Sequence, residues 1–221
     1  MGSIIRTAAN NVGASGVFSS SAFNNASLNS ITSLPTAVDG KMKLILSTTA
    51  SGNATRSFTS GIDSTYRTYL FKFFDIHPAT NDVNFQFQGS TQGASSSDGD
   101  YSNTITSTYF RAYHQEDDGG NALSYDTNGD QAQGSSFQDI ARGIGNDNDQ
   151  STSGELWLFN PSSTTYVKHW IARFNTAQAS DVTQDINTAG YFNTTSAINA
   201  IRFKFSSGNI DAGTIALYGI A

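Results

Sequence analysis

Apolar and polar side chains alternate in several short segments, and this period of two constrains the fold more than any other feature. In NDVNFQFQ, Val83, Phe85 and Phe87 alternate with asparagine and glutamine. Residues 67–75 (RTYLFKFFD) and 197–206 repeat the pattern with aromatic and aliphatic side chains on one face. A strand with this alternation buries one face and leaves the other in water. These segments therefore predict half-buried β-strands.

Weaker versions of the same signal recur between turn-forming residues along the chain. Further strands are expected at 42–46, 55–59, 102–113, 137–140, 156–159, 166–174 and 214–220. In residues 166–174, Lys168 and Trp170 share one face, whereas His169 and Ile171 share the other. About ten strands and no amphipathic helix predict an all-β, antiparallel, jelly-roll-like β-sandwich, favoured over an up-and-down barrel.

The first forty residues differ from the rest of the chain. Up to Val38 they carry one charge, Arg6, and their large apolar residues follow neither a strand nor a helix period. A disordered leader is one interpretation of such a segment. We favour an extended N-terminal arm over 1–40 that takes shape on a neighbouring surface, followed by a β-sandwich domain over 41–221.

The strand predicted at 214–220 ends close to the last residue given. Its alternation predicts Ile215 and Leu217 in the core, with Thr214, Ala216 and Tyr218 facing outward. Such a strand is stable at this position when another strand or another subunit covers its edge. We therefore expect a symmetric homo-oligomer, with a trimer as one option.

Composition excludes several classes of protein. Charged residues make up 14% of the chain, and the net charge of −6 lacks the basic footprint that nucleic-acid binding requires. No window approaches the roughly 18 apolar residues of a membrane span. The chain has no cysteine, so disulfides and thiolate metal sites are excluded, and folding in a reducing cytoplasm is expected.

No catalytic motif stands out. The two glutamates, Glu116 and Glu155, lie in a loop and at a predicted strand, and the sixteen aspartates mark out no pair for glycoside hydrolysis. The three histidines are widely spaced, and no zinc, phosphate-loop or nucleophile-elbow motif is present. We expect a protein that is not an enzyme and that uses no catalytic residue and no cofactor.

One loop has part of a calcium-binding pattern. Asp126, Asn128 and Asp130 have the 1, 3, 5 spacing of calcium ligands. Gln131 stands where the motif needs glycine, and Phe137 stands where it needs a bidentate glutamate. Because aspartate, asparagine and glycine also favour turns, we interpret the loop as a turn and assign no metal.

Aromatic residues leave a sugar-binding surface open as an alternative. Trp157 and Trp170 are candidates for a carbohydrate platform, although core packing in their hairpin is favoured. If the protein binds glycans, Tyr109, Tyr113 and Tyr125 near the loops are expected to carry the binding.

Four segments together resemble virion structural proteins of marine tailed bacteriophages. They read FTSGIDSTYRTYLFKFFDIHPATNDVNFQFQGS, TSTYFRAYH, LFNPSSTTYVKHW and GYFNTTSAINAIRFKFSSGNIDAGTIALYGI. The resemblance spans roughly 41–221, its most specific part is the ending SGNIDAG-x-I-x-LYGI, and residues 1–40 match nothing in it.

The resemblance implies a place in the virion, after assembly in the host bacterial cytoplasm, and carries no catalytic motif. It implies a capsid decoration, cement or accessory protein whose arm contacts major capsid, portal or tail proteins. The alternative is a tail-fibre or head-fibre module that binds host surface glycans.

Overall fold

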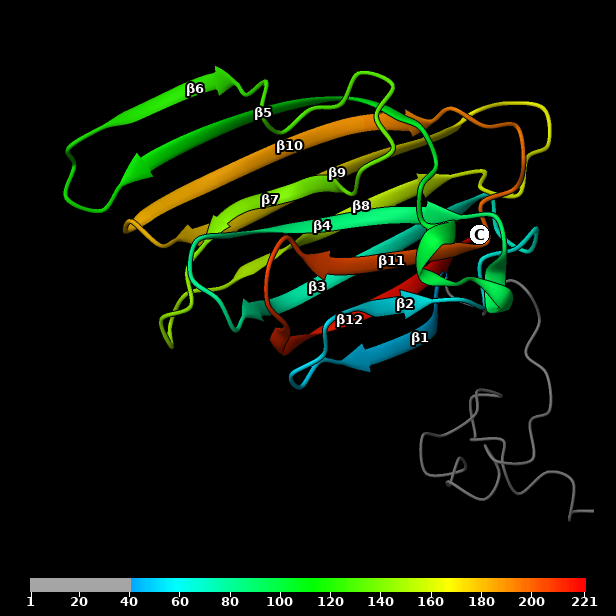
Figure 1. Cartoon of the computed structure of the whole chain (residues 1–221), viewed down its shortest axis with the longest axis horizontal. Coiled ribbons are helices and arrows are strands. Elements are labelled where there is room, and N and C mark those ends of the chain that lie inside the picture. Colours follow the sequence, from blue (N-terminus) through cyan, green and yellow to red (C-terminus); the bar gives the residue numbers. More distant parts are fainter. Residues whose placement is uncertain (1–40) are drawn as a thin grey trace, which may run out of the picture. The chain divides into compact units, whose positions relative to one another are not determined.

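Twelve strands make up the part of the chain that the computed structural model describes, residues 41–221 (Figure 1). The strands are β1 (Met42–Thr49), β2 (Arg56–Phe58), β3 (Thr68–Pro78), β4 (Val83–Ser90), β5 (Ile105–Gln115), β6 (Asn121–Tyr125), β7 (Gln138–Ile144), β8 (Thr152–Phe159), β9 (Lys168–Gln178), β10 (Val182–Phe192), β11 (Ala200–Phe205) and β12 (Ile210–Ile220). Two 3-10 turns, η3 (Gly93–Ser95) and η4 (Asp98–Asp100), follow β4. The arm predicted at 1–40 lies outside the described residues. Within 41–221, no helix has the length and apolar character that crossing a membrane requires.

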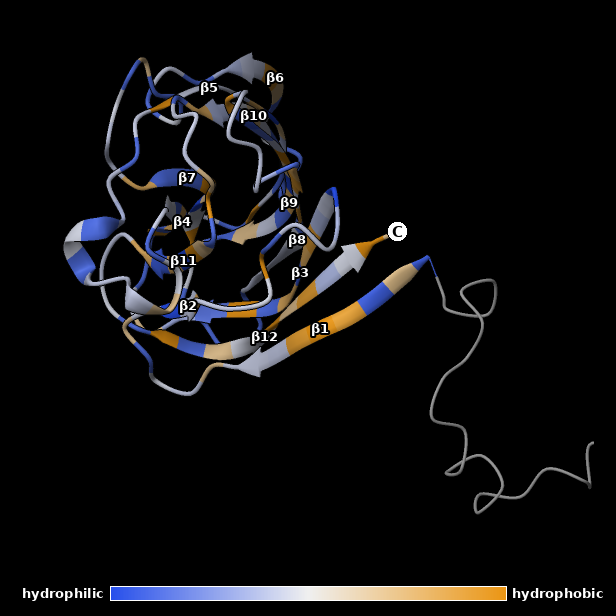
Figure 2. Ribbon diagram, turned by 90° about the vertical axis from the view of Figure 1, so that its right-hand side faces the viewer, coloured by the Kyte–Doolittle hydropathy of each residue, from blue (hydrophilic) through white to orange (hydrophobic). Residues whose placement is uncertain are grey.

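The strands form two layers with purely antiparallel pairing. The larger layer has the order β1-β12-β3-β8-β9-β10-β5-β6, and the smaller has the order β2-β11-β4-β7. One bridge, between Ile144 of β7 and Gln178 of β9, joins the layers. Figure 2 shows the larger layer curling around the smaller one.

The strand order is that of a jelly roll with insertions. When β5, β6, β9 and β10 are set aside, the remaining strands pair as β1-β12-β3-β8 and β2-β11-β4-β7. Two four-stranded sheets interleaved in this way define the double-sheet jelly roll. The inserted strands widen one sheet. The all-β, jelly-roll-like antiparallel sandwich expected from the sequence is thus confirmed.

Aromatic rings from both layers meet at Phe203 of β11, which is fully buried. Its ring lies within 6.3 Å of five others, measured between centroids: Phe58, Phe71, Phe73, Phe85 and Phe87. Of the four phenylalanines that alternate with polar residues in β4 and β11, Phe85, Phe87 and Phe203 belong to this cluster. The period of two therefore places aromatic side chains between the sheets.

Strand β9 has the two faces that its sequence predicts. Trp170 and Phe174 are buried, whereas His169 and Ile171 are exposed. Lys168 is also buried on the inner face, where its Nζ donates hydrogen bonds to the backbone oxygens of Tyr166 (2.6 Å) and Thr194 (3.1 Å). Burial lowers the pKa of the Lys168 ammonium group, because the charged form loses hydration.

The prediction of about ten strands missed β6 and β10. Val182, Gln184, Ile186 and Thr188 point inward from β10, and two of these four are polar. The apolar alternation that marks the other strands is therefore interrupted. Strand β6 is a five-residue edge strand with little alternation of its own.

The strand predicted at 214–220 extends over Ile210–Ile220 and lies between β1 and β3. Ile215 and Leu217 are in the core, as expected. A strand of the same chain covers the edge of β12, so this position does not itself require a second subunit. Among the strands of residues 41–221, β1 and β6 are the free edges of the larger sheet.

Candidate functional site

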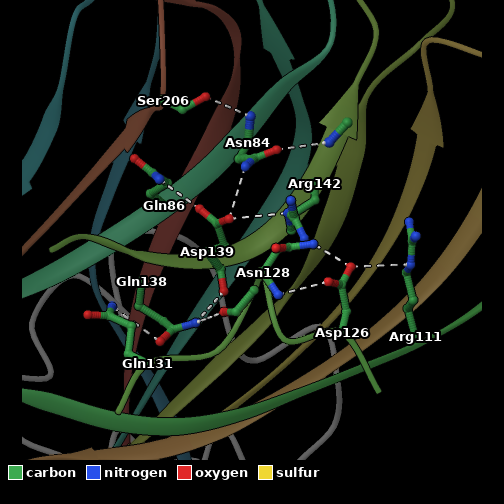
Figure 3. Close-up of polar contacts among 12 residues, drawn as sticks. Asn84, Gln86, Arg111, Asp126, Asn128, Gln131, Gln138, Asp139, Arg142 and Ser206 are labelled. Atoms are coloured by element: carbon green, nitrogen blue, oxygen red, sulfur yellow. Dashed lines mark hydrogen bonds and ion pairs between the residues drawn. The ribbon is translucent and has the colours of Figure 1, made fainter. Parts of the chain in front are cut away.

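Two arginines and two aspartates gather where β4, β5, β7 and the loop after β6 meet (Figure 3). Oδ2 of Asp126 lies 2.9 Å from Nη1 of Arg142 and 3.6 Å from Nε of Arg111. Nε of Arg142 lies 3.3 Å from Oδ2 of Asp139. All four side chains are largely buried. Arg142 therefore links two carboxylates that come from different elements.

Amide side chains complete the surroundings of Asp139. Nε2 of Gln86 donates a hydrogen bond of 2.7 Å to Oδ1, and Nδ2 of Asn84 donates one of 2.9 Å to Oδ2. Burial raises the pKa of the Asp139 carboxyl group, although the hydrogen bond from Gln86 and the charge of Arg142 act in the opposite direction.

A polar cavity of about 220 Å³ opens beside this cluster. Its lining includes Asp82, Arg111, Asp126, Arg142 and Gln178. The carboxylates of Asp126 and Asp139 are engaged by guanidinium and amide groups of the chain itself. Such an arrangement ties strands together and leaves neither carboxylate free for general acid or base chemistry. We interpret the cluster as structural.

The loop with part of a calcium pattern folds as a turn. Oδ1 of Asp126 accepts a hydrogen bond of 3.0 Å from the backbone N–H of Asn128, and its Oδ2 binds Arg142. The carboxylate of Asp130 accepts a hydrogen bond from the hydroxyl of Tyr125. Within residues 41–221, no three acidic or histidine side chains are grouped to hold a metal ion.

Two of the aromatic residues considered for glycan binding are in the core. Tyr109 is fully buried, and burial raises the pKa of its hydroxyl. Trp170 packs edge-on against Phe87, with 4.9 Å between ring centroids. The role expected for Tyr109 is therefore wrong, as is a sugar platform on Trp170, because neither ring reaches the surface. The core packing favoured for Trp170 is confirmed.

The other three aromatic candidates reach the surface to different extents. Tyr113 is half-buried, beneath the guanidinium of Arg111. Tyr125 is exposed on β6. Trp157 is half-buried on the outer face of β8, where its Nε1 donates a hydrogen bond of 3.0 Å to Glu155. The core packing favoured for Trp157 is therefore wrong, because Leu156 and Leu158 occupy the inward positions of this strand.

The residues considered for catalysis have separate partners. Glu155 lies 3.7 Å from Nζ of Lys72, and Glu116 is exposed in the β5–β6 turn. His77 lies 3.7 Å from Asp211, and His114 lies 3.2 Å from Asp118. None of these contacts joins two of the candidates to each other.

A surface that the sequence did not reveal crosses the outer face of the larger sheet. Strand register places outward-facing residues of seven strands in two adjacent rows. One row is Thr108, Ala189, Ile171, Trp157, Leu70, Tyr218 and Leu44; the other is Thr106, Tyr191, His169, Phe159, Thr68, Ile220 and Met42. We call these two rows the outer band. Seven strands and two rows correspond to about 30 Å by 14 Å, or roughly 400 Å².

The outer band is apolar along most of its length and contains no acidic residue, lysine or arginine. Leu70 is 2% exposed although it lies outside the core cluster, so its outer-face neighbours Trp157 and Tyr218 cover it. Ion pairs border the outer band on one side: Lys72 with Glu155, and Arg173 with Asp185 at 2.8 Å. These charges neutralise one another.

A groove of about 500 Å³ lies within the outer band, over β10. Small residues, Ala189 and Gly190, form its floor, and Ile171 and Phe159 stand on one side. His169 and Tyr191, with 5.9 Å between their ring centroids, lie toward one end. The groove thus combines an apolar floor with a few groups that can form hydrogen bonds, as small-molecule sites do.

The chain matches no protein-family model, no curated protein and no solved structure. The function is therefore inferred from the fold and from these surfaces. No sequence motif contains Arg111, Arg142 or Asp139. The one signal for their cluster is an aspartate, Asp139, within the strand predicted at 137–140. No short stretch of the sequence predicts the outer band, because the register between strands that are distant in the chain brings its residues together.

Proposed function

We propose that this chain is a non-enzymatic structural protein of a bacteriophage virion, a capsid decoration, cement or accessory protein anchored to the particle by residues 1–40. It assembles in the host bacterial cytoplasm and remains in the virion. The observation that carries this proposal is the outer band, a continuous apolar strip on an exposed sheet face.

The size and charge of the outer band favour a protein partner. Contiguous apolar patches of several hundred Å² on soluble proteins mark interaction surfaces. The apolar centre of a standard interface is surrounded by a polar rim, and each partner contributes about 800 Å² in total. The outer band supplies apolar side chains for such a centre, and the neutralised ion pairs beside it supply part of a rim.

Composition and the sequence resemblance support the same proposal. Residues 1–40 combine scattered large apolar side chains with very few charges, as expected of a segment that is stabilised by another protein's surface. The resemblance to virion proteins covers residues 41–221. These residues fold as a jelly roll, an architecture common in viral particles.

Particle reconstitution tests this proposal. Virions lacking the protein are incubated with either the full chain or residues 41–221, and bound protein is counted after the particles are purified. We expect the full chain to bind and the truncated chain to remain in solution with an unchanged melting temperature. Full occupancy by residues 41–221 would contradict anchoring by the arm, and failure of the full chain to bind would contradict the virion assignment.

The groove over β10 favours one alternative, a tail-fibre or head-fibre module that binds host surface glycans. A sugar ring presents C–H groups on its faces and hydroxyls at its edges, which suits a floor of Ala189 and Gly190 beside His169 and Tyr191. This location differs from the loop tyrosines first considered for glycan binding.

A glycan array with the full chain tests the alternative. If the groove binds sugar, Ile171→Glu abolishes the signal because it places a charge in the apolar wall. Tyr166→Glu is the matched control, since Tyr166 is 70% exposed and does not line the groove. A glycan signal that Ile171→Glu leaves intact would exclude the groove as the sugar site.

A further inference from the structure

Both free edges of the larger sheet expose large apolar side chains. Of the nine exposed large hydrophobic residues within 41–221, three (Met42, Leu44 and Leu46) lie on β1 and three (Phe110, Leu123 and Tyr125) lie on the β5–β6 hairpin. Figure 2 shows the apolar colouring of β1 along the margin of the sheet. An edge strand presents unpaired backbone N–H and C=O groups, so an apolar edge is a template for another strand.

The directions of the two edge strands allow them to pair between copies. Every neighbouring pair from β1 through β12, β3, β8, β9, β10 and β5 to β6 is antiparallel. Eight alternating strands leave β1 and β6 running in opposite directions. A second copy placed in line with the first can therefore continue the sheet with β6 antiparallel to β1.

Basic side chains flank β1 at both ends. Lys41 and Lys43 are exposed at its beginning. At its end, the guanidinium of Arg56 donates a hydrogen bond to the backbone oxygen of Thr49. Strand β1 is thus an apolar edge between two positively charged ends.

Acidic side chains flank β6 at both ends. The exposed run Glu116, Asp117 and Asp118 lies in the turn before the strand. After the strand, Asp130 is held beside Tyr125 by the hydrogen bond from the tyrosine hydroxyl. Strand β6 is thus an apolar edge between two negatively charged ends.

These charges distinguish the possible pairings. Two β1 edges would place Lys41 and Lys43 of one copy beside cations of the other, and two β6 edges would place acids beside acids. Antiparallel pairing of β1 with β6 instead brings Lys43 toward Asp130 and Arg56 toward the acidic turn. Opposite charges across an interface favour the correct partner, and like charges exclude the wrong one.

We propose that copies of this chain assemble head to tail, with β6 of one copy pairing antiparallel with β1 of the next. Leu44 and Leu123 lie at the centre of this contact, and Met42 and Tyr125 extend its apolar surface. A head-to-tail contact of this type generates a closed ring when its rotation closes, and a filament when it does not. The inference is independent of the virion assignment, because it concerns the purified protein alone.

Cysteine crosslinking tests the pairing, since the chain has no cysteine of its own. Leu44 is 53% exposed and Leu123 is 74% exposed, so Leu44→Cys and Leu123→Cys preserve the fold. With a short bismaleimide crosslinker, a mixture of the two single variants should give a covalent dimer. Each variant alone should stay monomeric on a denaturing gel, and a chain with both cysteines should give a ladder.

Charge substitutions give a second measurement. Leu44→Glu and Leu123→Lys should each weaken self-association at least tenfold by analytical ultracentrifugation, and one chain with both changes should recover most of it. Tyr166→Glu should have no effect. The melting temperature of each variant checks that the fold is intact.

Three results would overturn the proposal. Crosslinking of Leu44→Cys with itself would establish β1–β1 pairing. Loss of association that the double variant does not recover would show that the two edges do not meet. A full-length protein that stays monomeric at every concentration tested would show that another molecule, or no molecule, occupies these edges.

Discussion

Oδ2 of Asp126 lies 2.9 Å from Nη1 of Arg142, and this contact joins the loop after β6 to strand β7. The same guanidinium reaches Asp139 through its Nε, so one side chain contacts two carboxylates, and Arg111 supplies a second cation beside Asp126. The cluster lies close to the bridge between the two sheets, since Gly143 and Gln178 line the same cavity.

Removing the shared cation should destabilise the fold. Arg142→Met leaves the largely buried Asp139 without a cation and Asp126 with Arg111 alone, and we expect the free energy of unfolding to fall by about 3 kcal/mol. Arg173→Met is the control, because water screens the exposed Arg173–Asp185 pair and its loss should change stability little. Urea denaturation measures both. Equal losses for the two variants would mean that the buried cluster contributes no more to stability than an exposed ion pair does.

The raised pKa of Asp139 predicts a dependence of stability on pH. Burial raises this pKa above its ordinary value of 3.8. Between the unfolded-state and folded-state pKa values, the folded protein binds more protons, so the contribution of Asp139 to stability falls as pH rises. Asp63, whose pKa is lowered chiefly by the backbone hydrogen bond of Thr65, acts in the opposite direction.

Comparison with Asp139→Asn isolates this contribution, because the other carboxylates remain unchanged. Between pH 7 and pH 4, the original protein should gain stability relative to the variant as pH falls. Denaturation curves at four or five pH values measure the difference. A difference that is constant with pH would mean that Asp139 titrates alike in both states.

Gly190 should not tolerate a methyl group. A Cβ at this position would lie 2.5 Å from the backbone oxygen of Thr106 and 2.8 Å from the ring of Trp170. Because backbone cannot move aside cheaply, Gly190→Ala should cost roughly 1–3 kcal/mol. Gly99→Ala is the control, since no atom lies within 4 Å of its Cβ position. Thermal unfolding should show a lower melting temperature for the first variant alone.

Phe203 should be among the most sensitive core positions. Its ring is fully buried among aromatic rings from both sheets, so Phe203→Ala should cost about 3–5 kcal/mol. Phe74→Ala is the matched control, because Phe74 is 46% exposed and its loss should cost less than about 1 kcal/mol. Chemical denaturation compares the two. A small loss at Phe203 would mean that the surrounding rings collapse into the space.

Local alternation was enough to identify most strands and the fold class. Strand β9 was predicted with both faces correct, even though Lys168 lies on the buried one. Strand β10 was missed because Gln184 and Thr188 occupy inward positions, where Gln184 accepts a hydrogen bond from Arg111. A buried amide with a charged partner looks the same in the sequence as an exposed one.

The surfaces could not be predicted, because they arise from pairing between distant segments. Ile171 and Trp157 become neighbours through β8–β9 register, and Tyr218 joins their row only through β3 and β12. Likewise, the burial of Tyr109 depends on the loop at Gly129, whose Cβ position lies 2.6 Å from the tyrosine ring. No window of sequence contains these relationships.

The pairing of β1 with β12 has a consequence for how the protein is made. The hydroxyls of Thr49 and Thr214 lie 3.1 Å apart in this pair, although 165 positions separate them in the chain. A ribosome that has just released β1 must therefore add every strand from β2 to β12 before this pair can form. Folding should be slow, as in other proteins dominated by such distant contacts. Until the pair forms, the apolar strands of the unfinished sheet are exposed and prone to aggregate.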